Sequence, residues 1–124
     1  MRIINTDKAP KAIGPYSQGV ISNGFIFVSG QIALDPDTNS LISGGIEEQT
    51  LRVLENIEEI LEAAGSSKEK VVRCDVFLTD LKLFPDFNKA YEKFFGKHKP
   101  TRVTVEVSSL PKGALVEISA IAEI

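Results

Sequence analysis

The chain has 124 residues, 43% of them hydrophobic and 25% charged, a composition that excludes a disordered polypeptide and predicts one domain over residues 1–124. The net charge of −3 argues against nucleic acid or an anionic membrane surface as the main partner, although local basic residues could still bind a small anion. With one cysteine, no apolar leader at the N-terminus and no stretch of transmembrane length, the sequence predicts a cytoplasmic protein without disulfides.

Three short strands are predicted in the N-terminal third of the chain, at Arg2–Asn5, Gln18–Ser22 and Phe25–Gly30. Asn23-Gly24 joins the second and third strands as a hairpin, because both central residues of a type I′ turn need positive φ. The segment Gly14–Gln18 contains a glycine and a proline, which should hold Tyr16 in place. Gly30 ends the third strand, where a glycine allows a ligand to approach the backbone closely.

Helices and strands are predicted to alternate in the rest of the chain. The segment Ile46–Ala64 has apolar residues at helical spacing and glutamates on its other side, and Gly65 supplies a left-handed stop. Ser66 and Glu69 have the spacing of a capping box, which predicts one short helical turn. The later elements are a strand, a helix with a proline in its first turn, and two strands separated by a break at Ser108–Gly113: Val71–Thr79, Leu83–Phe95, a strand starting at about Arg102, and Ala114–Ile118.

The order β-β-β-α-β-α-β-β predicts an α+β fold with one six-stranded mixed sheet. Two helices can cover only one face of such a sheet. Apolar and polar residues alternate along the last two strands: Arg102, Thr104 and Glu106 against Val103, Val105 and Val107, and Glu117 and Ser119 against Val116 and Ile118. The second face is therefore mixed, which favours an oligomer that packs these faces around a partly polar interior; a solvated face is the alternative.

Two charged residues on these strands are difficult to explain by packing. Arg102 carries a planar guanidinium, which can hold a carboxylate through two hydrogen bonds; the alternative is a surface ion pair with Asp or Glu. Glu117 has apolar neighbours and could act as a general base on water with a raised pKa. Its alternative is a salt bridge, for instance to Arg102 itself. These two residues are the leading site candidates.

The other reactive side chains do not indicate a second site. His98 is the only histidine and is expected to be solvated in a basic loop, so neither Ser17 nor Ser29 has a histidine base. Cys74 alternates with core positions and is expected to be an inert buried thiol. The sequence contains no metal-ligand cluster, Gly-rich phosphate loop or Ser-His-Asp set.

Several motifs together resemble the Rid (YjgF) family, whose members hydrolyse 2-iminobutanoate and 2-iminopropanoate. The most specific part combines three blocks: Pro100-Thr101-Arg102, Leu110-Pro111-Lys112-Gly113 and Val116-Glu117-Ile118. Further matches extend along nearly the whole chain, at Gly14–Gln18, Ser29–Ile32, Asp35-Pro36, Gln49, Asn56, Ala64–Ser66 and Asn88–Tyr91.

The resemblance implies a chorismate-mutase-like fold in a homotrimer, whose sheets form a central barrel with sites in the three clefts between subunits. It implies that Arg102 binds the substrate carboxylate and that Glu117 positions or activates the hydrolytic water. Four further residues match family positions that line the cleft: Tyr16, Ser29, Gly30 and Asn88. No metal or organic cofactor is implied. Many bacterial members carry cysteine two residues after the arginine, where this chain has Thr104, so the resemblance does not extend to a reactive thiol.

The combined prediction is a homotrimeric deaminase. It would convert 2-imino or enamine acids, left by pyridoxal-phosphate enzymes that dehydrate threonine or serine, into 2-keto acids and ammonia. The alternatives are a non-catalytic, small-carboxylate-binding regulatory trimer and a holdase-like interaction protein. The pair Arg102 and Glu117 favours the enzyme over the holdase but does not separate enzyme from binder. Ribonuclease activity, also attributed to the family, is disfavoured by the acidic net charge and the lack of a histidine pair.

Overall fold

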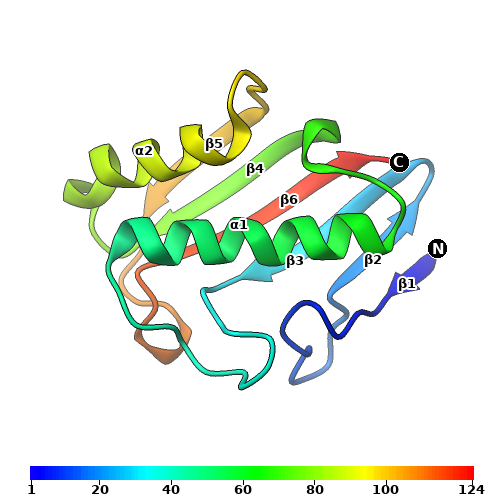
Figure 1. The fold of residues 1–124 in the computed structure, drawn as a ribbon, viewed down its shortest axis with the longest axis horizontal. Helices are drawn as coiled ribbons and strands as arrows, with labels where there is room; N and C mark the ends of the chain where they lie inside the picture. Colours follow the sequence, from blue (N-terminus) through cyan, green and yellow to red (C-terminus); the bar gives the residue numbers. More distant parts are fainter.

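The computed structural model describes residues 1–124, which form one six-stranded sheet with two helices on the same face (Figure 1). The sheet has the strand order β1-β2-β3-β6-β4-β5, and β4 and β5 are its only parallel neighbours. The predicted α+β class, mixed sheet and element order are confirmed. The elements are β1 Arg2–Ile4, β2 Gly19–Ser22, β3 Phe25–Gln31, α1 Ile46–Ala63, β4 Val71–Leu78, α2 Phe84–Phe95, β5 Thr101–Glu106 and β6 Val116–Glu123, with short 3-10 turns at Lys68–Lys70, Leu81–Leu83 and Pro111–Gly113.

Turn residues set the ends of several elements, as the sequence predicts. Asn23 (φ 50°) and Gly24 (φ 79°) both adopt left-handed conformations, which the type I′ hairpin between β2 and β3 requires. Gly65 (φ 81°) follows the end of α1 in the same conformation. Pro85 lies in the first turn of α2, where its missing N–H leaves no helical hydrogen bond unmade.

The short helical turn predicted after α1 is present at Lys68–Lys70, but the capping box that suggested it is wrong. The Ser66 hydroxyl donates to the backbone oxygen of Glu123 at 2.5 Å, at the end of β6. The 3-10 turn Lys68–Lys70 begins after Ser67 and has no side-chain cap. Ser66 therefore ties the end of α1 to the sheet, a contact over 57 residues of chain that local spacing could not predict.

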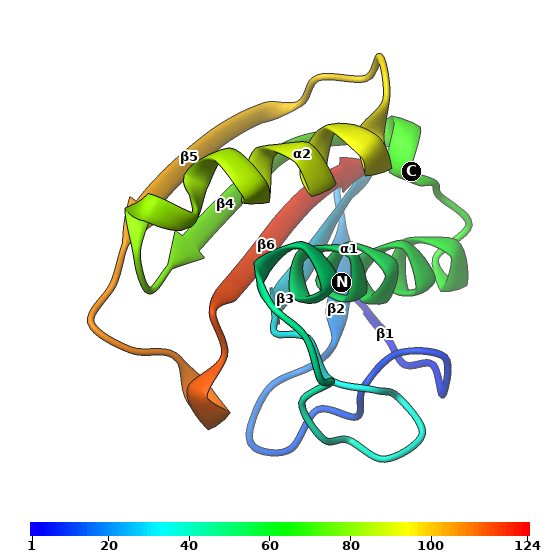
Figure 2. The ribbon, with the colours of Figure 1, turned by 60° about the vertical axis from the view of Figure 1, so that its left-hand side comes forward.

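The helices bury one face of the sheet and leave the other uncovered, with α1 and α2 on the same side (Figure 2). Large side chains from both layers form the core, among them Ile26, Leu54, Ile60, Leu61, Leu78, Phe87 and Ile118. The uncovered face exposes large apolar side chains by 40–46%: Phe25, Phe27, Val103 and Val105. The same face carries Arg73, Asp75 and Glu117, so the predicted mixed character is confirmed. Neither helix combines the length and apolarity that crossing a bilayer requires.

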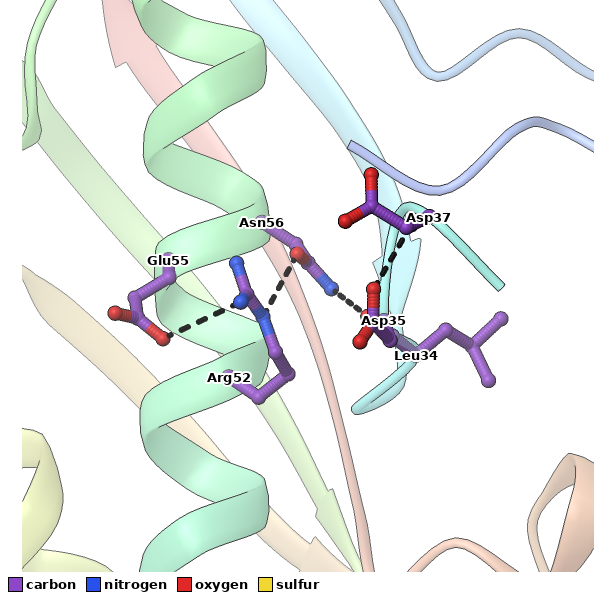
Figure 3. Close-up of polar contacts among 6 residues, drawn as sticks. All are labelled: Leu34, Asp35, Asp37, Arg52, Glu55 and Asn56. Atoms are coloured by element: carbon purple, nitrogen blue, oxygen red, sulfur yellow. Dashed lines mark hydrogen bonds and ion pairs between the residues drawn. The ribbon is translucent and has the colours of Figure 1, made fainter. Parts of the chain in front are cut away.

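The long loop between β3 and α1 is fixed to the first helix by a fully buried amide (Figure 3). Nδ2 of Asn56 on α1 donates to the backbone oxygen of Leu34 at 3.0 Å. Oδ1 of the same amide accepts from Nε of Arg52 at 3.1 Å, so both of its ends are paired, as burial demands. Farther along the loop, the backbone N–H of Asp37 donates to Oδ1 of Asp35 at 2.8 Å. The loop is therefore a fixed wall beside the end of β3.

Candidate active site

Glu117 lies near the start of β6 and lines a pocket of about 400 Å³ together with Tyr16 and Gly30. Its side chain is half-buried, and burial raises the pKa of its carboxyl, as the sequence predicts. No ion pair of the structure includes Glu117. A carboxylate with a raised pKa and no cationic partner is a stronger base than an ordinary glutamate, which suits it to take a proton from water.

Gly30 leaves the space that the Glu117 carboxyl occupies. A Cβ atom built on Gly30 would lie 3.0 Å from both the carboxyl carbon and Oε2 of Glu117. The structure therefore shows a close side-chain approach to this glycine. The ligand approach that the sequence analysis considered stays a prediction, since Gly30 also lines the pocket.

Replacing Gly30 by alanine is expected to push the Glu117 carboxyl out of position. Because small displacements of a reacting group are costly, a reaction that uses Glu117 as its base should slow by about tenfold. The thermal unfolding midpoint should move by less than about 4 °C, since the clash involves the end of a flexible side chain. Gly45→Ala is the control: a Cβ there meets only Oε1 of Glu48 at 3.7 Å, and it should leave the rate unchanged. Equal rates for both variants would contradict the positioning of Glu117 by Gly30.

Arg102 lies on the edge strand β5 beneath α2, where three aromatic rings surround its guanidinium. The guanidinium carbon is 4.8 Å from the ring centre of Tyr91, 5.4 Å from that of Phe84 and 5.5 Å from that of Phe87, the three rings of an aromatic collar. Nη1 donates to Oδ1 of Asn88 at 3.0 Å, the only hydrogen bond of this side chain. No carboxylate pairs with Arg102, so the predicted alternative of an ion pair within the chain is wrong.

The collar holds the guanidinium without neutralising it. Burial raises the pKa of the Tyr91 hydroxyl, so the nearest ring stays uncharged. Arg102 keeps its full charge and four unused N–H donors in a fixed plane, the arrangement that matches a carboxylate. It lines a second pocket of about 530 Å³ with Asn88 and Tyr91.

In one chain, Arg102 and Glu117 leave the sheet on opposite faces. Strand β4 lies between their strands, with Cys74 opposite Arg102 and Phe77 opposite Glu117. Neighbours in register share a face, and Cys74 and Phe77 are an odd number of residues apart, so their side chains point in opposite directions. The salt bridge between Arg102 and Glu117 that the sequence left open is therefore wrong for one chain.

The predicted site residues divide among separate places. Tyr16 and Gly30 lie with Glu117 in one pocket, and Asn88 lies with Arg102 in the other. Ser29 lines neither of these pockets: its hydroxyl donates to the backbone oxygen of Ser17 at 2.6 Å. One chain thus holds most of these residues in two separate pockets, one with Arg102 and one with Glu117.

The family model described as Endoribonuclease L-PSP matches residues 6–124 of this chain. The chain belongs to this family, the Rid (YjgF) family. A RutC family protein of Pyrococcus abyssi is 54% identical over 120 residues, which cover 97% of this chain and 94% of that protein. The 2-iminobutanoate/2-iminopropanoate deaminase of Homo sapiens is 45% identical over 121 residues, which cover 98% and 88%. The crystal structure of E. coli TdcF with bound serine has a TM-score of 0.95 at 42% identity, covering 100% of this chain and 99% of that one.

In this Rid protein the position two residues after the site arginine, Thr104, has a buried hydroxyl oxygen without a hydrogen-bond partner. The only thiol, Cys74, is buried on β4, opposite Arg102. Burial raises the pKa of the Cys74 thiol to about 11. The predicted burial of the cysteine is confirmed, and its raised pKa supports the prediction of an inert thiol.

Cys74 of the folded protein is therefore expected to resist thiol reagents at pH 8. The raised pKa keeps the sulfur protonated below about pH 11, and the thiolate is the reactive form. Mixing with Ellman's reagent should give reaction at least about 100-fold slower than for the chain unfolded in guanidinium chloride. Immediate reaction of the folded protein would contradict this environment for Cys74.

Sequence reasoning missed three features of this site. The sequence analysis did not single out the collar rings on α2, and it placed Lys112 of the Glu117 pocket only in the break between two strands. The expectation of a solvated His98 is wrong: this side chain is half-buried, and its Nε2 donates to the backbone oxygen of Val71 at 2.7 Å. No three histidine, cysteine, aspartate or glutamate side chains are grouped as a metal site requires.

Proposed function

We propose that this Rid protein hydrolyses the C=N bond of 2-imino acids and their enamine tautomers, releasing 2-keto acids and ammonia. The observation that carries the proposal is the guanidinium of Arg102, which three aromatic rings and Asn88 fix in place without any carboxylate partner. A substrate carboxylate completes this site through two parallel hydrogen bonds. The name of the human relative, 2-iminobutanoate/2-iminopropanoate deaminase, and the serine bound to TdcF support a small substrate with a carboxylate.

Glu117 acts as the acid and base in the proposed reaction. Its carboxylate takes a proton from water while the water oxygen bonds to the imine carbon, and the C=N electron pair moves to nitrogen. The proton then passes from Glu117 to the nitrogen of the carbinolamine. Glu117 next takes the proton of the carbinolamine hydroxyl and passes it to the nitrogen, so the C–N bond breaks, ammonia leaves and the carbonyl forms. Arg102 holds the carboxylate of the substrate throughout, so the imine carbon stays in line with the water.

We propose that the Arg102 pocket of one subunit and the Glu117 pocket of its neighbour meet in a homotrimer and form one active site. Arg102 and Glu117 of one chain lie on opposite faces of the sheet, so one substrate can reach both only if a neighbouring subunit supplies one of them. The uncovered sheet face exposes Phe25, Phe27 and Val103 by 40–46%, and a barrel formed by three such faces would bury them. This Rid-like domain would work in the cytoplasm, where amino-acid dehydratases produce its substrates.

A carboxylate-binding trimer without turnover is the second candidate function, because Arg102 alone serves both roles. Ribonuclease activity, despite the description of the family model, has little support in this chain. His98 is the only histidine, and its Nε2 is already bound to the backbone oxygen of Val71. Acid–base cleavage of RNA by a histidine pair is therefore not available.

The test couples a threonine dehydratase to this protein and follows the formation of 2-ketobutanoate. Acceleration of 2-ketobutanoate formation above the uncatalysed hydrolysis of the imine would support the deaminase. Calorimetric binding of 2-ketobutanoate without any acceleration would support the binding trimer instead. Neither acceleration nor binding would overturn both functions.

A further inference from the structure

We propose that Lys112 is a specificity-determining residue, which closes the entrance of the Glu117 pocket and limits the size of the substrate side chain. This inference rests on the proposed function. Two loops contribute residues to the pocket lining: the loop after β3, which includes Asn39, and the 3-10 turn Pro111–Gly113. Nζ of Lys112 donates to the backbone oxygen of Asn39 at 3.1 Å. Both residues line the pocket and their hydrogen bond is exposed, so the bond joins the two loops on the solvent side of the pocket.

The backbone at both ends of this bridge has an uncommon conformation. Lys112 has φ 59° and ψ 19°, and Asn39 has φ 58°. Left-handed backbone is several-fold more common for asparagine than for lysine, and only glycine adopts it freely. Outside the β2–β3 hairpin, these two are the only non-glycine residues with positive φ. Such conformations persist where surrounding contacts hold them and are concentrated at functional sites.

Both loops are anchored independently of the bridge. On one side the Asn39 N–H donates to the backbone oxygen of Asp35 at 2.7 Å, and the buried Asn56 amide holds Leu34 (Figure 3). On the other side the N–H of Leu115, which follows the turn, donates to Oε1 of the buried Gln49 at 2.9 Å. Both loops are therefore held in place without the Lys112 side chain. Removing this side chain should widen the entrance and leave the two loops where they are.

The walls below the bridge are suited to an aliphatic side chain. Ile32, Leu34 and Pro111 line the pocket beside Glu117. In the proposed closed form the methylenes of Lys112 would lie across the entrance, which would admit a short alkyl group and exclude an aromatic ring. An exposed single hydrogen bond is weak, so the bridge opens and closes readily, and its closed form sets the preference.

The test compares the binding of two 2-keto acids, 2-ketobutanoate and phenylpyruvate, by calorimetry. In Lys112→Ala the ratio of the phenylpyruvate Kd to the 2-ketobutanoate Kd should fall by at least about tenfold, since removing the methylenes admits the ring. Lys112→Met, which keeps an unbranched side chain but cannot donate to Asn39, should lower the ratio in the same direction. Rates with imines made from alanine and phenylalanine by an amino-acid oxidase should change in parallel.

Two variants serve as controls. Lys11→Ala removes another lysine that lines the same pocket but makes no hydrogen bond through its side chain, and Asn39→Gly keeps the backbone oxygen that Lys112 uses. Both should leave the ratio within about twofold of the wild type, because the bridge remains. An unchanged ratio in Lys112→Ala and Lys112→Met, or the same change in Lys11→Ala, overturns the role of Lys112 alone. Failure of the wild type to bind or hydrolyse any of these acids overturns the proposed function as well.

Discussion

Replacing Arg102 by lysine is expected to lower kcat/KM for 2-imino acid hydrolysis by about 100-fold, although the charge is kept. A lysine ammonium cannot form two parallel bonds to a carboxylate, and it cannot lie flat among the three collar rings. Most of the loss should be in KM, because the carboxylate is held equally in the ground state and the transition state. The affinity for 2-ketobutanoate should fall by the same factor, which calorimetry can measure without turnover.

The controls for Arg102 come from the same chain. Arg73 lies exposed on the uncovered face with its Nε 3.0 Å from Oδ1 of Asp75, so Arg73→Lys should have no effect on KM. Asn88→Ala removes the one hydrogen bond that orients the guanidinium but leaves the collar, and it should raise KM by about tenfold. Wild-type kinetics for Arg102→Lys would show that this residue does not bind the substrate carboxylate.

Local patterns predicted the elements of this fold because each depends on neighbouring residues. The positive φ of Asn23 and Gly24, the helix stop at Gly65 and the alternation along β5 and β6 all follow from short stretches of sequence. The raised pKa of Glu117 was also predictable, since its strand neighbours are apolar. Contacts between distant segments were not predictable, as the failed capping box at Ser66 shows.

Predicting where Arg102 and Glu117 lie relative to each other requires the register of the sheet. The alternation of residues shows which neighbours share a side of the strand with Arg102 or with Glu117. Only the pairing of both strands with β4 shows whether these two sides are the same face of the sheet. Cys74 opposite Arg102 and Phe77 opposite Glu117 place the two charges on opposite faces. The bridge from Lys112 to Asn39 spans 73 residues of chain and has no local signal. The placement of Arg102 and Glu117 on opposite faces was therefore outside the reach of pattern analysis.

Glu117→Gln is expected to lower kcat by about 1,000-fold, since the amide can neither take a proton from water nor return it to nitrogen. The wild-type rate should rise with pH as the carboxyl loses its proton, and burial places this rise at a higher pH than for an ordinary glutamate. The residual rate of the variant should lack this rise. A full pH–rate profile of both proteins measures the difference, and an unchanged kcat would exclude Glu117 as the base.

The loss should not reflect unfolding. A carboxyl whose pKa is raised in the folded state makes the folded protein bind more protons than the unfolded chain, so stability falls as pH rises between the two pKa values. Glutamine lacks this penalty, and Glu117→Gln should be at least as stable as the wild type at pH 7 in thermal unfolding.

Mixed trimers test whether Arg102 and Glu117 of different subunits act together. Co-expressed Arg102→Ala and Glu117→Gln chains, each inactive alone, should recover about a quarter of the wild-type rate, because random assembly pairs an intact arginine with an intact glutamate at one interface in four. No recovery would show that the two residues do not meet across subunits.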